Sequence, residues 1–183
     1  WSLLDVLKTH ETVNARGTFA PLSAMELSQI DANRAHLEEV GLQAIREGKV
    51  AAVLLAGGQG TRLGFDKPKG MYNIGVTREL YIFECLINNV MEIVKKAGAW
   101  IPFYIMTSDK NYDDTTAFLK EKNYFGYNAE YIHFFKQEMA PSVDYNGKLL
   151  MEAPDRLSLS PNGNGGWFSS LCRYGYDKQM KEA

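Results

Sequence analysis

The chain has 183 residues, of which 45% are hydrophobic and 23% are charged, and its formal net charge at pH 7 is −2. This composition is typical of a globular domain with one sizeable core and excludes an intrinsically disordered chain. The slightly acidic balance argues against a nucleic-acid-binding surface, which needs a clear excess of Lys and Arg.

The sequence also lacks the signals of a membrane or secreted protein. No apolar run approaches the roughly 20 residues of a membrane span, and the first residues do not form a signal peptide pattern. The two cysteines, Cys85 and Cys172, lie far apart and form no C-x-x-C motif. We therefore expect free thiols in a reducing compartment, the cytoplasm. Because the chain begins with Trp1 rather than Met, we expect it to be part of a longer protein.

Residues 1–22 are only weakly patterned, and a clearer helical pattern follows from Ser23 to Gly48. The leucine-rich first seven residues predict one short helix. Ser23–Glu26 fits a capping box, and apolar residues at helical spacing follow it as far as Gly48. We expect one or two helices here. We interpret residues 1–48 as a helical segment and residues 49–183 as the N-terminal part of a catalytic domain.

The stretch that follows combines a buried strand with a glycine-rich loop. Val50–Leu55 is short and wholly apolar, which indicates a buried strand. Four glycines then fall within eight positions: Gly57, Gly58, Gly60 and Gly64. Glycine has no Cβ and tolerates positive φ, so the backbone can approach a ligand closely. With Arg62 and Lys69 on or just after it, such a loop is suited to holding phosphate.

The loop does not match the two commonest phosphate-binding patterns. No Gly-Lys-Ser/Thr occurs, which excludes the Walker motif. The dinucleotide pattern G-x-G-x-x-G fits only at Gly58-Gln59-Gly60, because Leu63 stands at the sixth position and the next glycine comes one residue later. A glycine turn without a ligand therefore stays open as the alternative.

Strands and helices alternate after this loop. The pattern predicts a helix over Glu79–Ala97, a strand over Ile101–Thr107, a helix over Thr115–Lys122 and a strand over Tyr131–Phe135. This order is typical of an α/β fold with a parallel sheet. Such sheets bind ligands beyond the carboxyl ends of their strands, where residues 136–138 would fall.

The last third contains a hairpin and an unusual loop. Val143–Glu152 predicts a hairpin that turns at Asn146-Gly147. Five Asn and Gly residues then stand in a row at 162–166, followed by a predicted helix over Trp167–Tyr174. The Asn/Gly run is either a flexible surface turn or a second place where backbone and amide groups meet a ligand.

Several catalytic constellations are absent from the sequence. His10, His36 and His133 are scattered and form no metal-binding spacing. No G-x-S-x-G nucleophile motif and no D-x-D motif occur, and the adjacent Asp113 and Asp114 are expected to face solvent. The glycine-rich loop and its two cations instead favour a reaction on phosphate groups that uses no covalent nucleophile.

Three separated motifs carry a resemblance to a known family. They are LLAGGQGTRLG at 54–64 with PKGMY at 68–72, FFKQEMAP at 134–141, and SPNGNGG at 160–166. In this order they resemble the UDP-sugar pyrophosphorylases, most of all their UDP-N-acetylglucosamine pyrophosphorylase branch. The resemblance implies a Rossmann-like nucleotidyltransferase fold of the GT-A type, with a mixed, mostly parallel sheet and flanking helices, which this chain would leave incomplete at its C-terminal end.

The resemblance also implies an activity, the coupling of UTP to a sugar 1-phosphate with release of pyrophosphate. Arg62 and Lys69 would be the catalytic cations, on the β- and γ-phosphates and on the phosphate region of UTP. Asn164 would contact the sugar. The nucleotide would be bound by Leu55, Ala56, Gly57, Gly58, Gly60, Thr61, Gln137 and Gly163. Mg²⁺ would be the cofactor, with its acidic protein ligand beyond residue 183.

Departures from the family pattern leave alternatives open. Asn162 stands where the family usually has Asp, and the segment 77–80 also differs, so N-acetylglucosamine, N-acetylgalactosamine and glucose all remain possible sugars. A UTP–glucose-1-phosphate uridylyltransferase is one alternative, and a non-catalytic nucleotide-sugar-binding domain is another, although retention of both loop cations argues against the latter. A GT-A glycosyltransferase is disfavoured by the missing D-x-D. Lys69 could be a solvated lysine, Gln137 a strand cap and Asn164 a turn residue.

Overall fold

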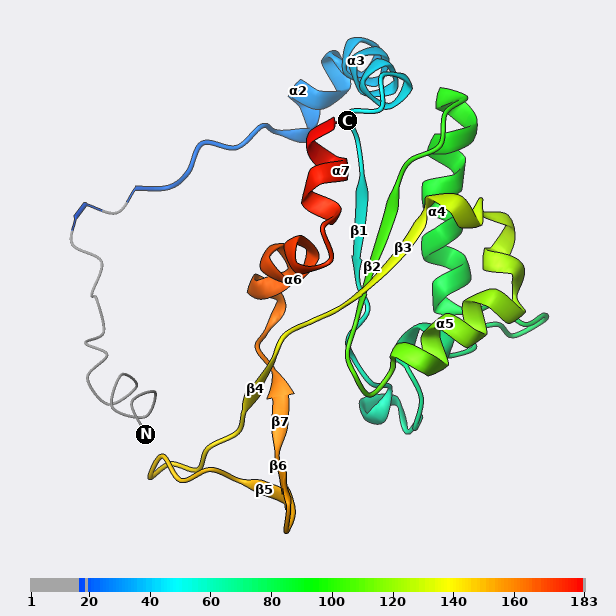
Figure 1. Ribbon diagram of the computed structural model, residues 1–183. Helices are drawn as coiled ribbons and strands as arrows, with labels where there is room; N and C mark the ends of the chain where they lie inside the picture. The colour runs from blue at the N-terminus through cyan, green and yellow to red at the C-terminus, as the bar shows by residue number, and fades with distance from the viewer. Residues whose placement is uncertain (1–16, 19, 183) are drawn as a thin grey trace.

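The computed structural model describes residues 17–18 and 20–182, and the helix expected in the first seven residues lies outside them. Figure 1 shows a small sheet between two groups of helices, with a β arm that projects from one end of the sheet. Within the described part of the chain, no helix combines the length and the apolar character that a membrane crossing needs.

Three parallel strands form the central sheet, in the order β1-β2-β3. They are β1 (Ala52–Leu55), β2 (Phe103–Thr107) and β3 (Ile132–Lys136). In the register of the sheet, Met106 of β2 lies beside Leu55 on one side and Phe135 on the other. The predicted α/β class and its three strands are thus confirmed, with strand ends shifted by one or two residues. The antiparallel pairs belong to the arm.

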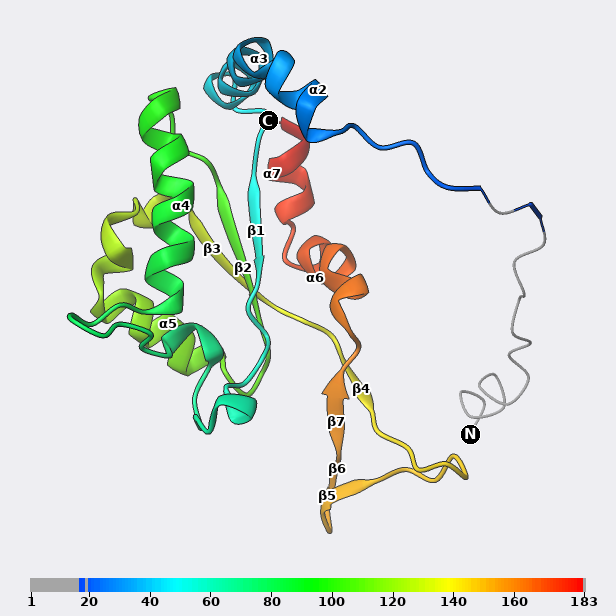
Figure 2. The same cartoon turned by 180° about the vertical axis from the view of Figure 1, so that it is seen from behind.

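Helices cover both faces of this sheet (Figures 1 and 2). On one face, α4 (Ile82–Ala97) and α5 (Tyr112–Glu121) pack with Phe103 and Ile105 into the larger core. On the other face, α6 (Trp167–Arg173) and α7 (Tyr176–Glu182) lie over Tyr104 and Met106. Because successive side chains of β2 point to opposite faces and both faces are covered, every residue of β2 is buried.

The helix boundaries follow local hydrogen bonds. The chain before α4 is held in a loop because the N–H groups of Gly75 and Leu80 both donate to Oδ1 of Asn73, at 2.9 and 3.0 Å. The helix therefore begins three residues later than predicted, and it ends as predicted before Gly98, which has φ 70°. Helix α5 begins three residues earlier than predicted, since the two aspartates of its first turn favour a helix N-terminus.

Two helices precede the sheet, α2 (Leu27–Ala32) and α3 (Arg34–Arg46). The predicted capping box at Ser23–Glu26 is wrong. Glu26 is itself the cap residue, and its N–H donates to the Oε1 atom of Gln29 at 2.8 Å. The pattern was shifted by three residues because Glu and Gln can form the same reciprocal arrangement as Ser and Glu. The predicted end at Gly48 is confirmed by its φ of 72°.

The β arm consists of two short antiparallel pairs. Strand β4 (Met139–Pro141) pairs with β7 (Leu159–Pro161), and β5 (Met151–Ala153) pairs with β6 (Arg156–Leu157). The predicted turn at Asn146-Gly147 is present, with φ 77° at Gly147. Figures 1 and 2 both show the arm leaving the end of the sheet at which β3 stops.

The connection from α5 to β3 contains a left-handed turn. In η3 (Asn123–Gly126), Asn123, Tyr124 and Phe125 all have φ values near 50°. This conformation costs a residue with a side chain about 1–2 kcal/mol. The Phe125 ring compensates by packing against Tyr81 and Phe118, with centroids 6.2 and 6.1 Å away. A second short turn, η4 (Ala129–Tyr131), leads into β3.

Two isoleucines of α4 differ in burial, and the effect of this difference on stability can be tested. Ile87 is 0% exposed and belongs to the larger core, whereas Ile93 on the same helix is 39% exposed. We expect Ile87→Ala to lower the free energy of unfolding by about 2–5 kcal/mol, because it opens a cavity. Ile93→Ala should cost less than about 1 kcal/mol. Urea unfolding measures both, and equal losses would contradict the placement of α4.

Candidate nucleotide-binding site

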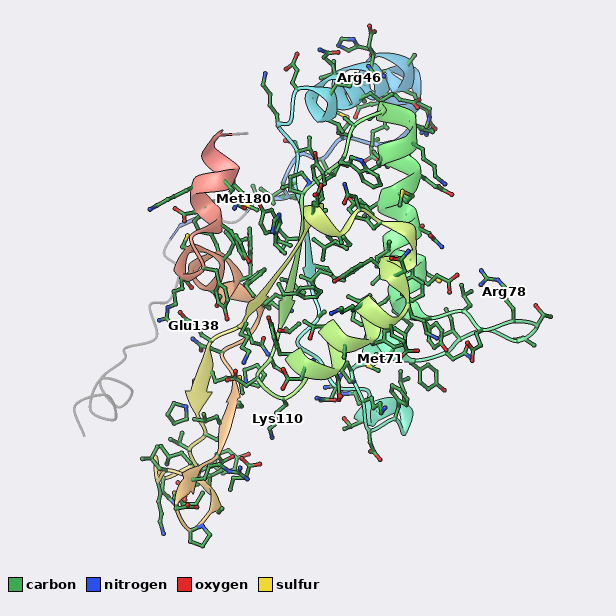
Figure 3. All side chains as sticks on the ribbon, turned by 45° about the vertical axis from the view of Figure 1, so that its right-hand side comes forward. Arg46, Met71, Arg78, Lys110, Glu138 and Met180 are labelled. Atoms are coloured by element: carbon green, nitrogen blue, oxygen red, sulfur yellow. The ribbon has the colours of Figure 1, made fainter. Side chains whose placement is uncertain are left out.

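A cavity of about 900 Å³ opens at the carboxyl edge of the sheet. Figure 3 marks this edge, where Glu138 lies at the point at which β3 runs into the arm and Lys110 lies in the turn after β2. The cavity is lined by Leu54, Leu55, Ala56, Gly57, Gly58, Gln59, Gly60, Thr61, Arg62, Leu63, Lys69, Gly70, Ile82, Phe83, Leu86, Gln137, Pro161 and Asn164. Segments far apart in the sequence therefore meet at one place.

All but one of the residues that the three motifs assign to a site line this cavity. The exception is Gly163, which is exposed and precedes Asn164. Its backbone has φ 72° and ψ 173°, a combination that is essentially restricted to glycine. Gly163 thus sets the course of the chain into η5 (Asn164–Gly166), the short turn that carries Asn164. The Asn/Gly run is a turn that leads directly into α6.

The glycine loop is closed on itself by backbone hydrogen bonds. The N–H of Gly60 donates to the carbonyl of Lys67 at 2.9 Å, and the N–H of Lys69 donates to the carbonyl of Gly58 at 3.3 Å. Between them lies the short helical turn η1 (Thr61–Leu63), and after them η2 (Lys69–Met71). These bonds fix the loop beside the cavity without a ligand.

Several backbone donors of this loop remain unused. Among them are the N–H groups of Gly57, Gly58, Gln59, Thr61 and Arg62, none of which makes a hydrogen bond to a described residue. Ala56 differs, because its N–H donates to the carbonyl of Met106 at 2.7 Å. Clustered free backbone donors at the end of a strand form a site for an anion, phosphate above all.

The two cations at the cavity have no carboxylate partner. Arg62 and Lys69 are both exposed, and neither forms an ion pair within the described part of the chain. Lys136 at the end of β3 contrasts with them. Its Nζ lies 3.1 Å from Oδ1 of Asp109, and the hydrogen bond to Asp109 raises the pKa of the lysine. The positive charge that faces the cavity is therefore available to an incoming anion.

Gln137 places a buried amide against the glycine loop. The residue is 7% exposed, and its backbone N–H donates to the carbonyl of Thr107 at 2.7 Å. A Cβ on Gly57 would stand only 2.5 Å from Nε2 of Gln137, so the amide lies directly on the Gly57 backbone. Nε2 is buried and has no partner among the described residues. An unpaired buried donor costs stability, and an acceptor on a ligand would remove that cost.

Sequence reasoning missed the apolar wall of the cavity. Ile82, Phe83 and Leu86 of α4 line it, although their spacing indicated only core positions. The Phe83 ring presses on Gly70, where an added Cβ would lie 2.3 Å from ring carbons. The signal that could have found this wall is the position of the first turn of α4 beside the edge of the sheet. The ring therefore requires a glycine at position 70, the residue after Lys69.

No group of three His, Cys, Asp or Glu side chains that could hold a metal ion occurs among the described residues. The residues that line the cavity include no carboxylate at all. They therefore do not supply the oxygen ligands that Mg²⁺ prefers in proteins. Any phosphate contact that these residues make is a direct one, through backbone N–H groups and the two cations.

A parallel sheet that presents such a loop beyond its first strand is typical of α/β domains that bind nucleotides. Comparison with known proteins agrees, since the family model described as UTP–glucose-1-phosphate uridylyltransferase matches residues 9–183. The chain belongs to this family of UDP-sugar pyrophosphorylases.

Individual relatives point to one branch of the family. The UDP-N-acetylglucosamine pyrophosphorylase of Saccharomyces cerevisiae is 45% identical over 136 residues, which cover 72% of this chain and 28% of the yeast protein. The solved structure of the Trypanosoma brucei enzyme of the same name, in complex with an inhibitor, matches with a TM-score of 0.73 and 34% identity over 80% of this chain and 30% of that one. A structure from Entamoeba histolytica gives a TM-score of 0.81 at 34% identity, over 90% of this chain and 42% of that one. The chain thus spans about a third of the length of its relatives.

The crowding at Gly70 can be tested against a glycine of the same loop. A methyl group at Gly70 would collide with the buried Phe83 ring, whereas a Cβ on Gly58 meets no atom within 4 Å. We expect Gly70→Ala to lower the free energy of unfolding by about 1–3 kcal/mol and Gly58→Ala to stay within about 0.5 kcal/mol of wild type. Urea unfolding without ligand measures both. A neutral Gly70→Ala would show that the ring does not hold this segment.

Proposed function

We propose that the full-length protein is a uridylyltransferase that couples UTP to a sugar 1-phosphate and releases pyrophosphate. One observation carries this proposal. Residues from three motifs that are far apart in the sequence line a single cavity, which combines free backbone donors, two unpaired cations and a buried amide. The names of the relatives support the same reaction.

The chemistry needs two anions to be brought together. A phosphate oxygen of the sugar 1-phosphate attacks the α-phosphorus of UTP, in line with the pyrophosphate that departs. Fixed positive charge lowers the barrier because it stabilises the charge that develops in the transition state. Arg62 binds the β- and γ-phosphates, for which its planar, permanently charged fork is suited. Lys69, which lines the same cavity, places a compact charge near the α-phosphate.

Other residues that line the cavity bind the base and the sugar. The carboxamide of Gln137 offers one donor edge and one acceptor, which match a carbonyl and the ring N–H of uracil. The glycine loop contacts the nucleotide through the backbone from Leu55 to Thr61. Asn164 contacts the sugar, and Gly163 allows the backbone turn that brings it there.

The names of the relatives indicate the sugar substrate. We propose N-acetylglucosamine 1-phosphate, because the relatives reported above are UDP-N-acetylglucosamine pyrophosphorylases. The full-length protein should be assayed for pyrophosphate release with UTP, Mg²⁺ and a panel of sugar 1-phosphates. The highest kcat/KM with glucose 1-phosphate would favour a UTP–glucose-1-phosphate uridylyltransferase. No release with any sugar, together with UDP-sugar binding, would favour a non-catalytic nucleotide-sugar-binding domain.

Three further expectations belong to this proposal. Nucleotidyltransferases of this type generally use a divalent metal, and we propose Mg²⁺. We also propose that the protein acts in the cytoplasm. Residues 1–48 would be a helical segment and residues 49–183 the N-terminal part of the catalytic domain.

The loop cations provide the first test of the reaction. We expect Lys69→Ala and Arg62→Ala in the full-length protein each to lower kcat by about 10²–10³-fold, the scale for the loss of one preorganised charge contact. Folding should be unchanged, since both side chains are exposed. Lys67→Ala is the matched control, because Lys67 is exposed in the same loop but does not line the cavity. Wild-type turnover in Lys69→Ala would remove that residue from the site.

The second test concerns the choice of base. We expect Gln137→Ala to raise the KM for UTP more than it lowers kcat, because a contact to the base is made equally in the ground state and the transition state. Discrimination against other nucleoside triphosphates should also fall. Gln43→Ala, an exposed glutamine on α3, is the control and should behave as wild type. An unchanged nucleotide preference in Gln137→Ala would leave Gln137 as a strand cap only.

A further inference from the structure

Asn111 lies in the turn after β2 and is completely buried. It stands at the N-cap of α5, but its side chain makes no hydrogen bond to that helix. Instead, Oδ1 accepts from the N–H and from the hydroxyl of Ser108, at 2.7 and 2.9 Å, and Nδ2 donates to the carbonyl of Ala56 at 3.0 Å. The partners fix the orientation of the amide, because a backbone N–H needs an acceptor and a carbonyl needs a donor.

This side chain takes the place of a hydrogen bond between two strands. The last ladder bond from β1 to β2 joins the N–H of Ala56 to the carbonyl of Met106 at 2.7 Å. If the parallel ladder continued, the N–H of Ser108 would donate to the carbonyl of Ala56. The carboxamide of Asn111 is inserted between these two groups and bonds to both. It therefore separates β1 from β2 by the width of an amide where the glycine loop begins.

The strand on the other side of β2 has no such spacer. The N–H of Gln137 donates directly to the carbonyl of Thr107 at 2.7 Å, so this residue stays bonded to β2. The backbone of Gly57, one residue beyond Ala56, lies in contact with the Gln137 amide. The position of Gly57 relative to Gln137 consequently depends on how far Asn111 holds the carbonyl of Ala56 from β2. Asn111 does not line the cavity itself, so it acts through Ala56.

We propose that Asn111 is a positioning residue for nucleotide binding, which places the start of the glycine loop relative to Gln137. The inference rests on the proposed function, since its ligand is UTP. The alternative, a role in stability alone, makes a different kinetic prediction. A less stable enzyme has fewer active molecules, which lowers kcat and leaves both KM values unchanged. A displaced loop weakens UTP selectively.

The test is Asn111→Asp in the full-length protein. The carboxylate is nearly isosteric and still accepts from Ser108, but it presents an oxygen where Nδ2 donated to the carbonyl of Ala56. We expect the KM for UTP to rise about tenfold, the effect of one lost hydrogen bond to a buried carbonyl, with an unchanged KM for the sugar 1-phosphate. Asn128→Asp is the matched control, because that side chain only accepts, from the N–H of Glu130, and lies outside the cavity. It should keep both KM values.

The possible results separate the role of Asn111 from the proposed function. A wild-type KM for UTP in Asn111→Asp would overturn the role of Asn111 while leaving the proposed function intact. A wild-type protein that neither binds UTP nor releases pyrophosphate would overturn the proposed function and this role with it. If Asn111→Asp does not fold, the neutral and smaller Asn111→Ser is titrated with UTP by calorimetry. We expect binding about tenfold weaker than that of wild type, and equal affinity would again overturn the role.

Discussion

The parallel pairing of β2 with both of its neighbours is the constraint on which the site depends. Parallel strands end at the same edge of a sheet, so the loop after β1 and the residues after β3 must meet beyond β2. The carbonyls of Met106 and Thr107 hold these two segments in place, because they accept hydrogen bonds from the N–H groups of Ala56 and Gln137. Helices cover both faces of the sheet and bury this central strand completely, and the backbone of Gly57 lies against the Gln137 amide beyond the end of the strand.

Glycine stands at different positions of the central stretch for different physical reasons. Gly57 leaves space for the Gln137 amide, and Gly70 leaves space for the Phe83 ring. Gly60 leaves space for the Phe65 ring and for the carbonyls of Phe65 and Lys67. A side chain at Gly58 would meet nothing within 4 Å, and its N–H is unused. Protein packing therefore explains three of these glycines, while Gly58 is free to face a ligand.

The site also carries features that lower the stability of the ligand-free protein. Two like charges, Arg62 and Lys69, share one cavity that no carboxylate of the described residues lines, and Nε2 of Gln137 is buried without a partner among those residues. Lys136 at the end of β3 contrasts with them, because it is paired with Asp109. Polar and charged groups that lack partners and cluster at one place are typical of functional sites, because a ligand supplies the missing partners.

The sequence by itself determined the α/β class, the three strands and the identity of the loop cations, because these depend on apolar periodicity and on local motifs. It misplaced the capping box at Ser23–Glu26, since Glu26 and Gln29 can form the same local arrangement. Only the tertiary structure decided which face each side chain of β2 occupies, because its first four residues are all hydrophobic and show no alternation. It alone revealed the role of Asn111, whose bond to Ala56 joins residues 55 positions apart. Such a contact is created by the register of the sheet, and no local pattern in the sequence encodes it.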